Sequence, residues 1–297
     1  MPVAFKDNYD VQGMATAAGS KALQNNFPPD NAFIIQRLVD EDAIVIGKTN
    51  MAEFACCASH SYSSMGGTVR NPYNRSLTTG GSSGGTAAAL ATSMALVGLG
   101  TDTGSSIRGP ASHASLVGLR PTMGRTSRDG IVPLSLERDI GGPMARTVQD
   151  AALLFSVMAG SDDRDPITLE APALPKTIAL SEEALKGQGI GYISGLVEKS
   201  LNGDIGDPRV RTLFQQAISD LQGGGAGWSV WTMRQCAPPI SKSTPATLSC
   251  MTSCMSWTTI CIPQVSRSPM PACSIWPNPI CMVPWSPIYS MGSNQIL

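Results

Sequence analysis

Two serine-containing turns in the sequence have residue types that could carry out nucleophilic chemistry. Gly80–Gly85 holds two serines among glycines, and Asp102–Pro110 holds two more directly after the apolar run of residues 95–100. A turn at the end of a buried strand can direct several backbone N–H groups toward one point, where they stabilise an oxyanion. A serine hydroxyl beside such a nest can attack a carbonyl carbon, so the pattern is compatible with acyl transfer.

A serine is a poor nucleophile unless a base accepts its proton. The usual base is histidine, and the chain has only His60 and His113. His113 is close in sequence to Ser106, so a Ser–His pair stays open at this point. No Gly-x-Ser-x-Gly elbow surrounds Ser106, the serine nearest to His113, which disfavours a hydrolase of the Ser–His–Asp type built on that pair.

The glycine-rich segment also has alternative interpretations. Glycine-rich loops before helices commonly bind phosphate groups. A Walker loop needs lysine after its last glycine, however, and Thr86 stands there. A structural Gly/Ser connector is the other alternative that the segment leaves open when it is taken alone.

Strand-like and helix-like patterns alternate along the chain and place these turns. Asp30 is a candidate cap for a helix with apolar positions at 33, 34, 38 and 39, and Asn50 for a helix over 51–58. Further helices are expected over 86–94, 147–159 and 207–221, and strands over 2–6, 43–46, 95–100 and 187–193. This alternation predicts an α/β layered fold.

Composition and charge limit the classes of partner. The 297 residues carry a net charge of −1, which gives no electrostatic reason to expect nucleic acid or an anionic membrane. No apolar run approaches the roughly 20 residues that span a bilayer, and no signal peptide is visible. A cytoplasmic protein is expected.

The composition changes abruptly at about residue 223. All 22 acidic residues precede this point, whereas residues 224–297 contain six of the eight cysteines and all five tryptophans. Back-translation of parts of this tail in another frame gives ordinary acidic and apolar sequence. We therefore expect two regions: a core over 1–222, and an anomalous tail over 223–297 that is frame-shifted or disordered. Sequencing the transcript across the junction tests this hypothesis.

Four segments together resemble the amidase-signature family of hydrolases. They are Gly80–Ala89, Gly100–Pro110, Gly118–Arg125 and Gly142–Thr147, and Gly47–Phe54 upstream matches as well. The family includes bacterial amidases, fatty acid amide hydrolase and the A subunit of glutamyl-tRNA amidotransferase. The resemblance covers residues 1–165 strongly and 185–222 loosely.

The resemblance implies a Ser–Ser–Lys relay. Ser106 is expected to be the acyl-forming nucleophile, Ser82 the bridging serine after a cis peptide bond from Gly81, and Lys48 the base. Lys48 can accept a proton only when it is neutral, so its pKa must fall from about 10.4 toward about 7. That shift corresponds to roughly 4–5 kcal/mol, which burial at a strand end can supply.

The resemblance also assigns the residues around the nucleophile. Ser105 stands where most members have glycine, and its side chain is expected to crowd or retune the turn. The oxyanion and substrate-binding set is Thr103, Gly104, Ser105, Ser106 and Gly81, and the supporting set is Asp102 and Arg108.

The expected fold is an α/β/α arrangement around a mixed β-sheet, incomplete at both ends relative to the family. The expected activity is hydrolysis of a linear carboxamide C–N bond, other than a peptide bond, to a carboxylic acid and ammonia or an amine. The substrate is expected to be a small-molecule amide that the sequence does not identify. No metal or organic cofactor is implied. The sequence leaves open whether the chain forms a homodimer. The alternatives are a non-enzymatic fragment of an amidase and an amidotransferase A-type subunit.

Overall fold

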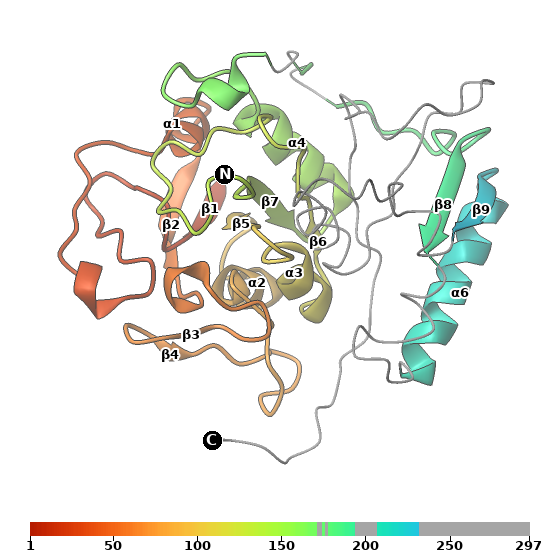
Figure 1. The fold of residues 1–297 in the computed structure, drawn as a ribbon, viewed down its shortest axis with the longest axis horizontal. Helices are drawn as coiled ribbons and strands as arrows, with labels where there is room; N and C mark the ends of the chain where they lie inside the picture. Colours follow the sequence, from red (N-terminus) through yellow and green to blue (C-terminus); the bar gives the residue numbers. More distant parts are fainter. Residues whose placement is uncertain (171–173, 176–177, 194–206, 232–297) are drawn as a thin grey trace, which may run out of the picture. The chain divides into compact units, whose positions relative to one another are not determined.

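The computed structural model describes residues 1–170, 174–175, 178–193 and 207–231 (Figure 1). These residues divide into two units, one up to Ile178 and one from Ala179 onward. Each unit is described by itself. Most of the anomalous tail, from residue 232 onward, lies outside the described residues, so its expected frame shift or disorder stays a prediction.

A mixed five-stranded sheet forms the centre of the first unit. The strand order is β2-β1-β5-β7-β6, in which β1 pairs in parallel with β2 and β5, and β7 pairs in antiparallel with β5 and β6. The predicted strands over 2–6, 43–46 and 95–100 are confirmed, whereas β6 and β7 were not predicted. The strands are β1 (Pro2–Lys6), β2 (Ile44–Thr49), β5 (Val97–Thr101), β6 (Val117–Gly118) and β7 (Gly141–Ala145).

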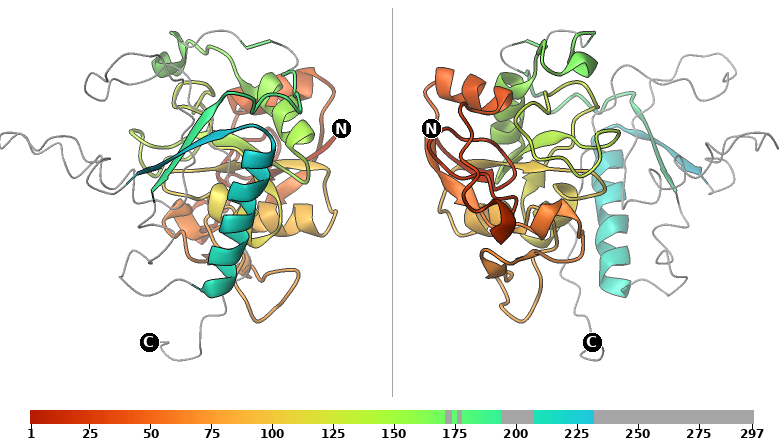
Figure 2. Two further views of the ribbon diagram at one scale, coloured as in Figure 1. Left: turned by 90° about the vertical axis from the view of Figure 1, so that its right-hand side faces the viewer. Right: turned by 60° about the vertical axis from the view of Figure 1, so that its left-hand side comes forward.

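Helices cover both faces of this sheet, which confirms the expected α/β/α layers (Figures 1 and 2). One core cluster joins Val3 and Phe5 of β1 to α1 (Phe33–Asp40) and α4 (Val148–Met158). A second cluster joins Ala4 of β1 to α2 (Gly84–Ala91) and α3 (Arg108–His113). Because successive strand residues point to opposite faces, Lys6 shares the α2 and α3 face with Ala4.

Two helix predictions differ from the structure. Helix α1 begins after Ala32 and has no side-chain cap, so Asp30 does not cap it. The helix expected over 51–58 is only a 3₁₀ turn, Glu53–Ala55, because Phe54 and Ala55 have positive φ angles. Asn50 instead accepts from the Met51 N–H and from Ser63 Oγ.

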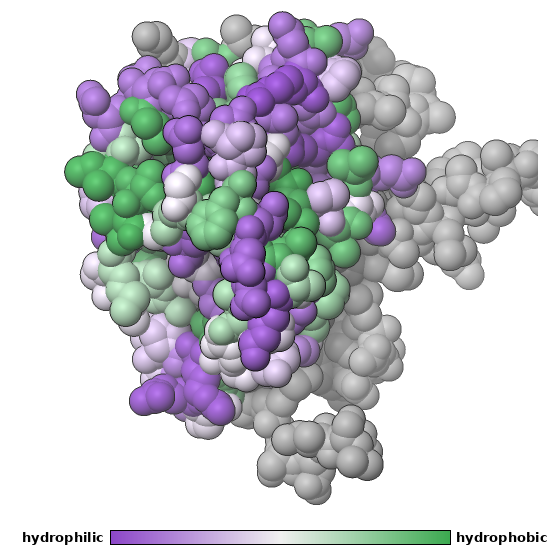
Figure 3. Space-filling model, turned by 90° about the vertical axis from the view of Figure 1, so that its left-hand side faces the viewer, coloured by the Kyte–Doolittle hydropathy of each residue, from purple (hydrophilic) through white to green (hydrophobic). Residues whose placement is uncertain are grey.

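The remaining short elements of the first unit lie in its connections. They are two further 3₁₀ turns, Lys21–Leu23 and Pro166–Thr168, and the antiparallel pair β3 (Tyr62–Ser63) and β4 (Gly67–Thr68). On the face drawn in Figure 3, hydrophobic side chains lie in several patches between hydrophilic ones. Ile44 and Ile46 of the edge strand β2 are among the exposed apolar residues of the unit.

The described part of the second unit is a β–α–β arrangement. Strands β8 (Gly189–Ile193) and β9 (Gly227–Trp231) pair in parallel, and α6 (Pro208–Gly223) precedes β9. Asp207 caps α6 by accepting from the Arg209 N–H at 2.8 Å, as an Asp-Pro helix start predicts. The predicted strand over 187–193 and helix over 207–221 are therefore confirmed. Within the described residues, no helix is both long and apolar enough to cross a bilayer.

Candidate active site

The two serine-containing turns meet at the end of β5. The backbone N–H of Ser83 donates to the carbonyl oxygen of Ser106 at 3.2 Å. Ser83 Oγ also accepts from the Thr101 N–H at 3.3 Å. Ser82 is fully buried and Ser106 is 4% exposed. The turns singled out from the sequence therefore form one site.

A buried lysine contacts Ser82, and it is Lys6 at the end of β1. Its Nζ lies 2.6 Å from Ser82 Oγ and 2.7 Å from Thr101 Oγ1. The Lys6 side chain is fully buried. Strand β1 lies between β2 and β5, so its last residue reaches the turn that follows β5.

The prediction that Lys48 contacts Ser82 is wrong. Lys48 Nζ lies 3.2 Å from Asp7 Oδ1 and donates to the carbonyl oxygen of Ala15 at 2.7 Å. The register explains this, because Lys48 pairs with Phe5, whereas Lys6 pairs with Thr49. Paired residues of parallel strands share a face, so Lys48 projects from the face opposite Lys6. Lys48 thus anchors the segment around residue 15.

Both lysines end a strand-like segment of the sequence, which is why strand position alone did not separate them. In the folded chain the two runs differ in burial, because the last four residues of Pro2–Lys6 are buried. The run Ile44–Thr49, by contrast, belongs to an edge strand with no fully buried residue. Strand order decides between them, and it depends on long-range pairing.

The buried setting of Lys6 makes its amine titrate near neutral pH. Burial lowers the pKa of Lys6 from its ordinary value of 10.5 to about 7, and the carboxylates of Asp102 and Asp139 act in the opposite direction. A substantial part of the Lys6 population is therefore an uncharged amine at pH 7–8. This is the shift that the sequence argument required of Lys48.

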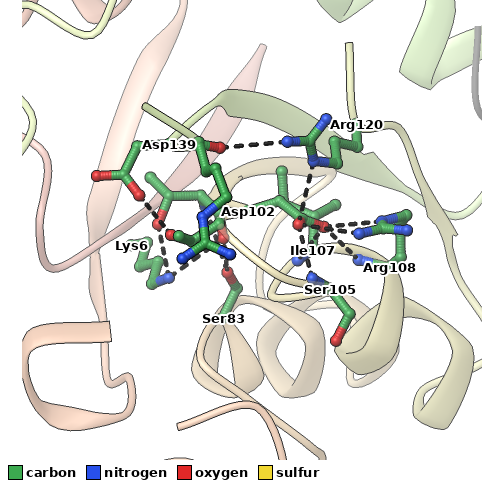
Figure 4. Close-up of polar contacts among 11 residues, drawn as sticks. Lys6, Ser83, Asp102, Ser105, Ile107, Arg108, Arg120 and Asp139 are labelled. Atoms are coloured by element: carbon green, nitrogen blue, oxygen red, sulfur yellow. Dashed lines mark hydrogen bonds and ion pairs between the residues drawn. The ribbon is translucent and has the colours of Figure 1, made fainter. Parts of the chain in front are cut away.

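The carboxylate of Asp102 organises the turn that carries Ser106. Its Oδ1 accepts from the Ser105 N–H at 2.8 Å, and its Oδ2 accepts from the Ile107 N–H at 3.1 Å and from Arg108 Nε at 3.0 Å (Figure 4). Arg120 Nε lies 3.3 Å from Oδ1. Burial acts to raise the pKa of Asp102, but the charges of Arg108 and Arg120 hold it below its usual value. Asp102 and Arg108 thus have the contacts expected of supporting residues.

The backbone N–H groups divide into engaged and free donors. The Ser105 N–H is taken by Asp102, and the Gly81 N–H donates to the carbonyl oxygen of Ala58 at 2.8 Å. Neither amide is therefore available to an oxyanion, contrary to the expectation for these two residues. Within the residues that the structure describes, no hydrogen bond occupies the N–H groups of three members of the expected set, Thr103, Gly104 and Ser106.

The loop before the glycine-rich segment fits closely around it. The peptide bond between Gly81 and Ser82 is cis, as the resemblance implies. A Cβ atom on Gly81 would lie 2.2 Å from the carbonyl oxygen of His60 and 2.4 Å from that of Cys57. Ser61 Oγ donates to the carbonyl oxygen of Gly80 at 2.9 Å. Backbone and hydroxyl contacts from residues 57–61 thus hold the segment that carries Ser82.

The histidines occupy other places. His113 lies behind the glycine-rich segment, where its Nδ1 would be 3.1 Å from a Cβ atom on Gly80. Burial lowers the pKa of His113. His60 Nδ1 lies 3.2 Å from Cys57 Sγ on an exposed loop. The described contacts therefore join Ser82 to a lysine and not to a histidine, and the described residues contain no cluster of three metal-ligating side chains.

Comparison with known proteins finds that the chain is similar in sequence to A subunits of glutamyl-tRNA(Gln) amidotransferases. The chain is 43% identical over 226 residues to the A subunit of a glutamyl-tRNA(Gln) amidotransferase from Acidothermus cellulolyticus, covering 76% of this chain and 44% of that protein. It is 40% identical over 225 residues to the corresponding protein of Cenarchaeum symbiosum, covering 76% of this chain and 45% of that protein.

Solved structures give the same result. Native peptide amidase from Stenotrophomonas maltophilia matches with a TM-score of 0.71 and 40% identity, covering 78% of this chain and 47% of that one. The A subunit of glutamyl-tRNA(Gln) amidotransferase from Thermotoga maritima matches with a TM-score of 0.70 and 33% identity, covering 78% of this chain and 50% of that one. The chain thus spans about half the length of the relatives that it matches.

The family model described as Amidase matches residues 1–260. This match contains the buried Lys6–Ser82 contact, the Ser106 turn and the five-stranded sheet described above. The chain therefore belongs to the amidase family.

Proposed function

We propose that the protein hydrolyses a carboxamide C–N bond through an acyl-enzyme on Ser106. The observation that carries the proposal is the 2.6 Å contact between the buried Lys6 Nζ and Ser82 Oγ, beside a turn with free N–H groups. Lys6 takes the role first expected of Lys48. The roles of Ser82 and Ser106 are kept from the sequence argument.

The reaction begins with proton transfer away from the nucleophile. Neutral Lys6 accepts the proton of the Ser82 hydroxyl while Ser82 Oγ accepts that of Ser106, and Ser106 Oγ bonds to the carbonyl carbon. The N–H groups of Thr103, Gly104 and Ser106 can then stabilise the oxyanion, and each such donor is worth about 3–4 kcal/mol in related chemistry.

The same relay runs in reverse to release the product. The proton returns from Lys6 through Ser82 to the leaving nitrogen, and the C–N bond breaks to give ammonia or an amine. Water then attacks the acyl carbon as Lys6 accepts its proton through Ser82, and the acid leaves as Ser106 recovers its hydrogen. No step needs a metal or an organic cofactor.

The substrate class is a carboxamide with a linear C–N bond. The exclusion of peptide bonds that was expected from the sequence has no support, since a peptide amidase is among the matching structures. Amides of peptides therefore belong to the proposed class. A second candidate function, an amidotransferase A-type subunit, is favoured by the 43% identity to such a protein. Glutamine-dependent transamidation with partner subunits would support it.

Labelling of Ser106 with a fluorophosphonate probe tests the proposed function. The wild-type chain should label, Ser106→Ala should not, and Lys6→Ala should label at least about 100-fold more slowly because the base is lost. Lys48→Met is the matched control. It should label within a few-fold of wild type while losing about 1–3 kcal/mol of stability, since the acceptors around Asp7 lose their donor.

The same experiment separates the alternatives. A wild-type chain that folds, by circular dichroism and a cooperative melt, but does not label would support the non-enzymatic fragment. Loss of labelling in Lys48→Met with retention in Lys6→Ala would reverse the assignment of the base.

A further inference from the structure

Three oxygen atoms surround the Lys6 amine, and two of them belong to Thr101. Thr101 Oγ1 lies 2.7 Å and the Thr101 carbonyl oxygen 3.4 Å from Nζ, and Ser82 Oγ is the third at 2.6 Å. A neutral amine has two N–H bonds and one lone pair. If both N–H bonds are directed at Thr101, the lone pair faces the Ser82 hydroxyl, as proton abstraction requires.

A buried asparagine holds Thr101 from the other side. Asn8 Nδ2 donates to Thr101 Oγ1 at 3.1 Å, and the residue is only 1% exposed. Asn8 Oδ1 is buried and has no hydrogen-bond partner among the described residues. An unpartnered buried acceptor costs about 1–3 kcal/mol, which leucine of similar size would avoid. The N–H bond that Asn8 directs at Thr101 Oγ1 explains why an asparagine, and not an apolar residue, occupies this buried position.

We infer that Asn8 and Thr101 are positioning residues that hold the Lys6 amine with its lone pair on Ser82, an inference that rests on the proposed function. With Asn8 and Lys6 both donating, both lone pairs of Thr101 Oγ1 are engaged. The competing state is an ammonium group that donates to all three oxygens, including Ser82 Oγ, and it cannot accept the serine proton. Lys6 donates to Thr101 Oγ1 in both states, but the positive end of the Asn8 N–H lies beside that oxygen and weakens the bond from the charged ammonium more than the bond from the neutral amine. Asn8 thereby favours the neutral amine.

Two carboxylates act to raise the pKa of Lys6, and neither is altered in the variants described below. These are Asp102, which is paired with Arg108 and Arg120, and Asp139, which accepts from Thr103 Oγ1 and from the Leu134 N–H at 2.8 Å. A carboxylate at position 8 would accept the Thr101 hydroxyl proton and place a negative charge next to the amine. The ammonium state would then be favoured.

The test is the Asn8→Asp variant, compared with wild type in two measurements. The first is the pH dependence of fluorophosphonate labelling, and the second is a direct NMR titration of the ¹⁵N-labelled Lys6 amine, assigned by its absence in Lys6→Met. Asn8→Asp should raise both midpoints by about one pH unit or more. The control Asn74→Asp adds the same charge on an exposed turn, where Asn74 Oδ1 already accepts from Ser76 Oγ, and should move neither midpoint.

Variants at Thr101 test the other half of the pair. Thr101→Val removes the hydroxyl at nearly constant shape and should slow labelling at pH 8 by about 10–100-fold, while Thr101→Ser should stay within about threefold of wild type. Equal losses in both variants, or an Asn8→Asp titration within about 0.3 units of wild type, would overturn the inference.

The outcomes also separate this inference from the proposed function. If wild type does not label, the proposed function fails, and the NMR titration still decides whether Asn8 controls the Lys6 amine. If Asn8→Asp does not fold, Asn8→Ser removes the amide without adding charge. It should then raise the Lys6 midpoint by a smaller amount, and an unchanged midpoint would again overturn the inference.

Discussion

Ser105 has a φ angle of 86°, in the left-handed region that favours glycine. A side chain in that region costs about 1–2 kcal/mol, partly offset because glycine loses more backbone entropy on folding. Ser105→Gly should therefore raise the free energy of unfolding by about 0.5–1 kcal/mol, measured by urea denaturation. Ser105→Ala keeps the Cβ atom and the strain, so it is the matched control and should stay near wild type. If the alanine and glycine variants are equally stable, the backbone explanation is wrong.

At the scale of elements, the loop over 57–61 and the glycine-rich segment should act as one unit. Gly81→Ala would drive a Cβ atom into the backbone oxygens of His60 and Cys57. We expect this variant to lose about 1–3 kcal/mol or more of stability and to label far more slowly at Ser106, because the segment carrying Ser82 must move. Gly223→Ala, whose Cβ atom would meet no atom within 4 Å, is the control. Normal labelling of a folded Gly81→Ala chain would contradict the expected coupling.

Elements with strong local signals could be predicted from the sequence, whereas their pairing could not. Helix α4 follows from its apolar period and from Thr147, which accepts the Asp150 N–H at 3.0 Å. The Ser106 turn follows from a fully buried strand that ends in a polar turn. Lys6 and Lys48 have similar local sequence contexts, and only the order β2-β1-β5 and the register distinguish them. The engagement of the Ser105 N–H by Asp102 likewise depends on side-chain geometry.

At the scale of the whole molecule, the buried Lys6 should make global stability depend on pH. Its pKa is about 7 in the folded chain and near 10.5 when exposed, so between these values the unfolded chain binds one more proton. The free energy of unfolding should therefore rise with pH across this window, by at most about 4–5 kcal/mol from this group. Below pH 7 both states are protonated, and the full cost of the buried charge is present.

The difference between wild type and Lys6→Met isolates this contribution, because cysteines and exposed groups titrate alike in both. Urea unfolding should be measured from pH 7 to pH 9.5. This range stays below the pH at which Tyr9 would add its own pH dependence to the free energy of unfolding, which arises because burial raises the pKa of that phenol in the folded chain. The methionine variant should be the more stable at pH 7, and its advantage should shrink steadily as the pH rises. A constant difference across the range would mean that Lys6 has an ordinary pKa in the folded chain. The amine could then not serve as a neutral base at physiological pH.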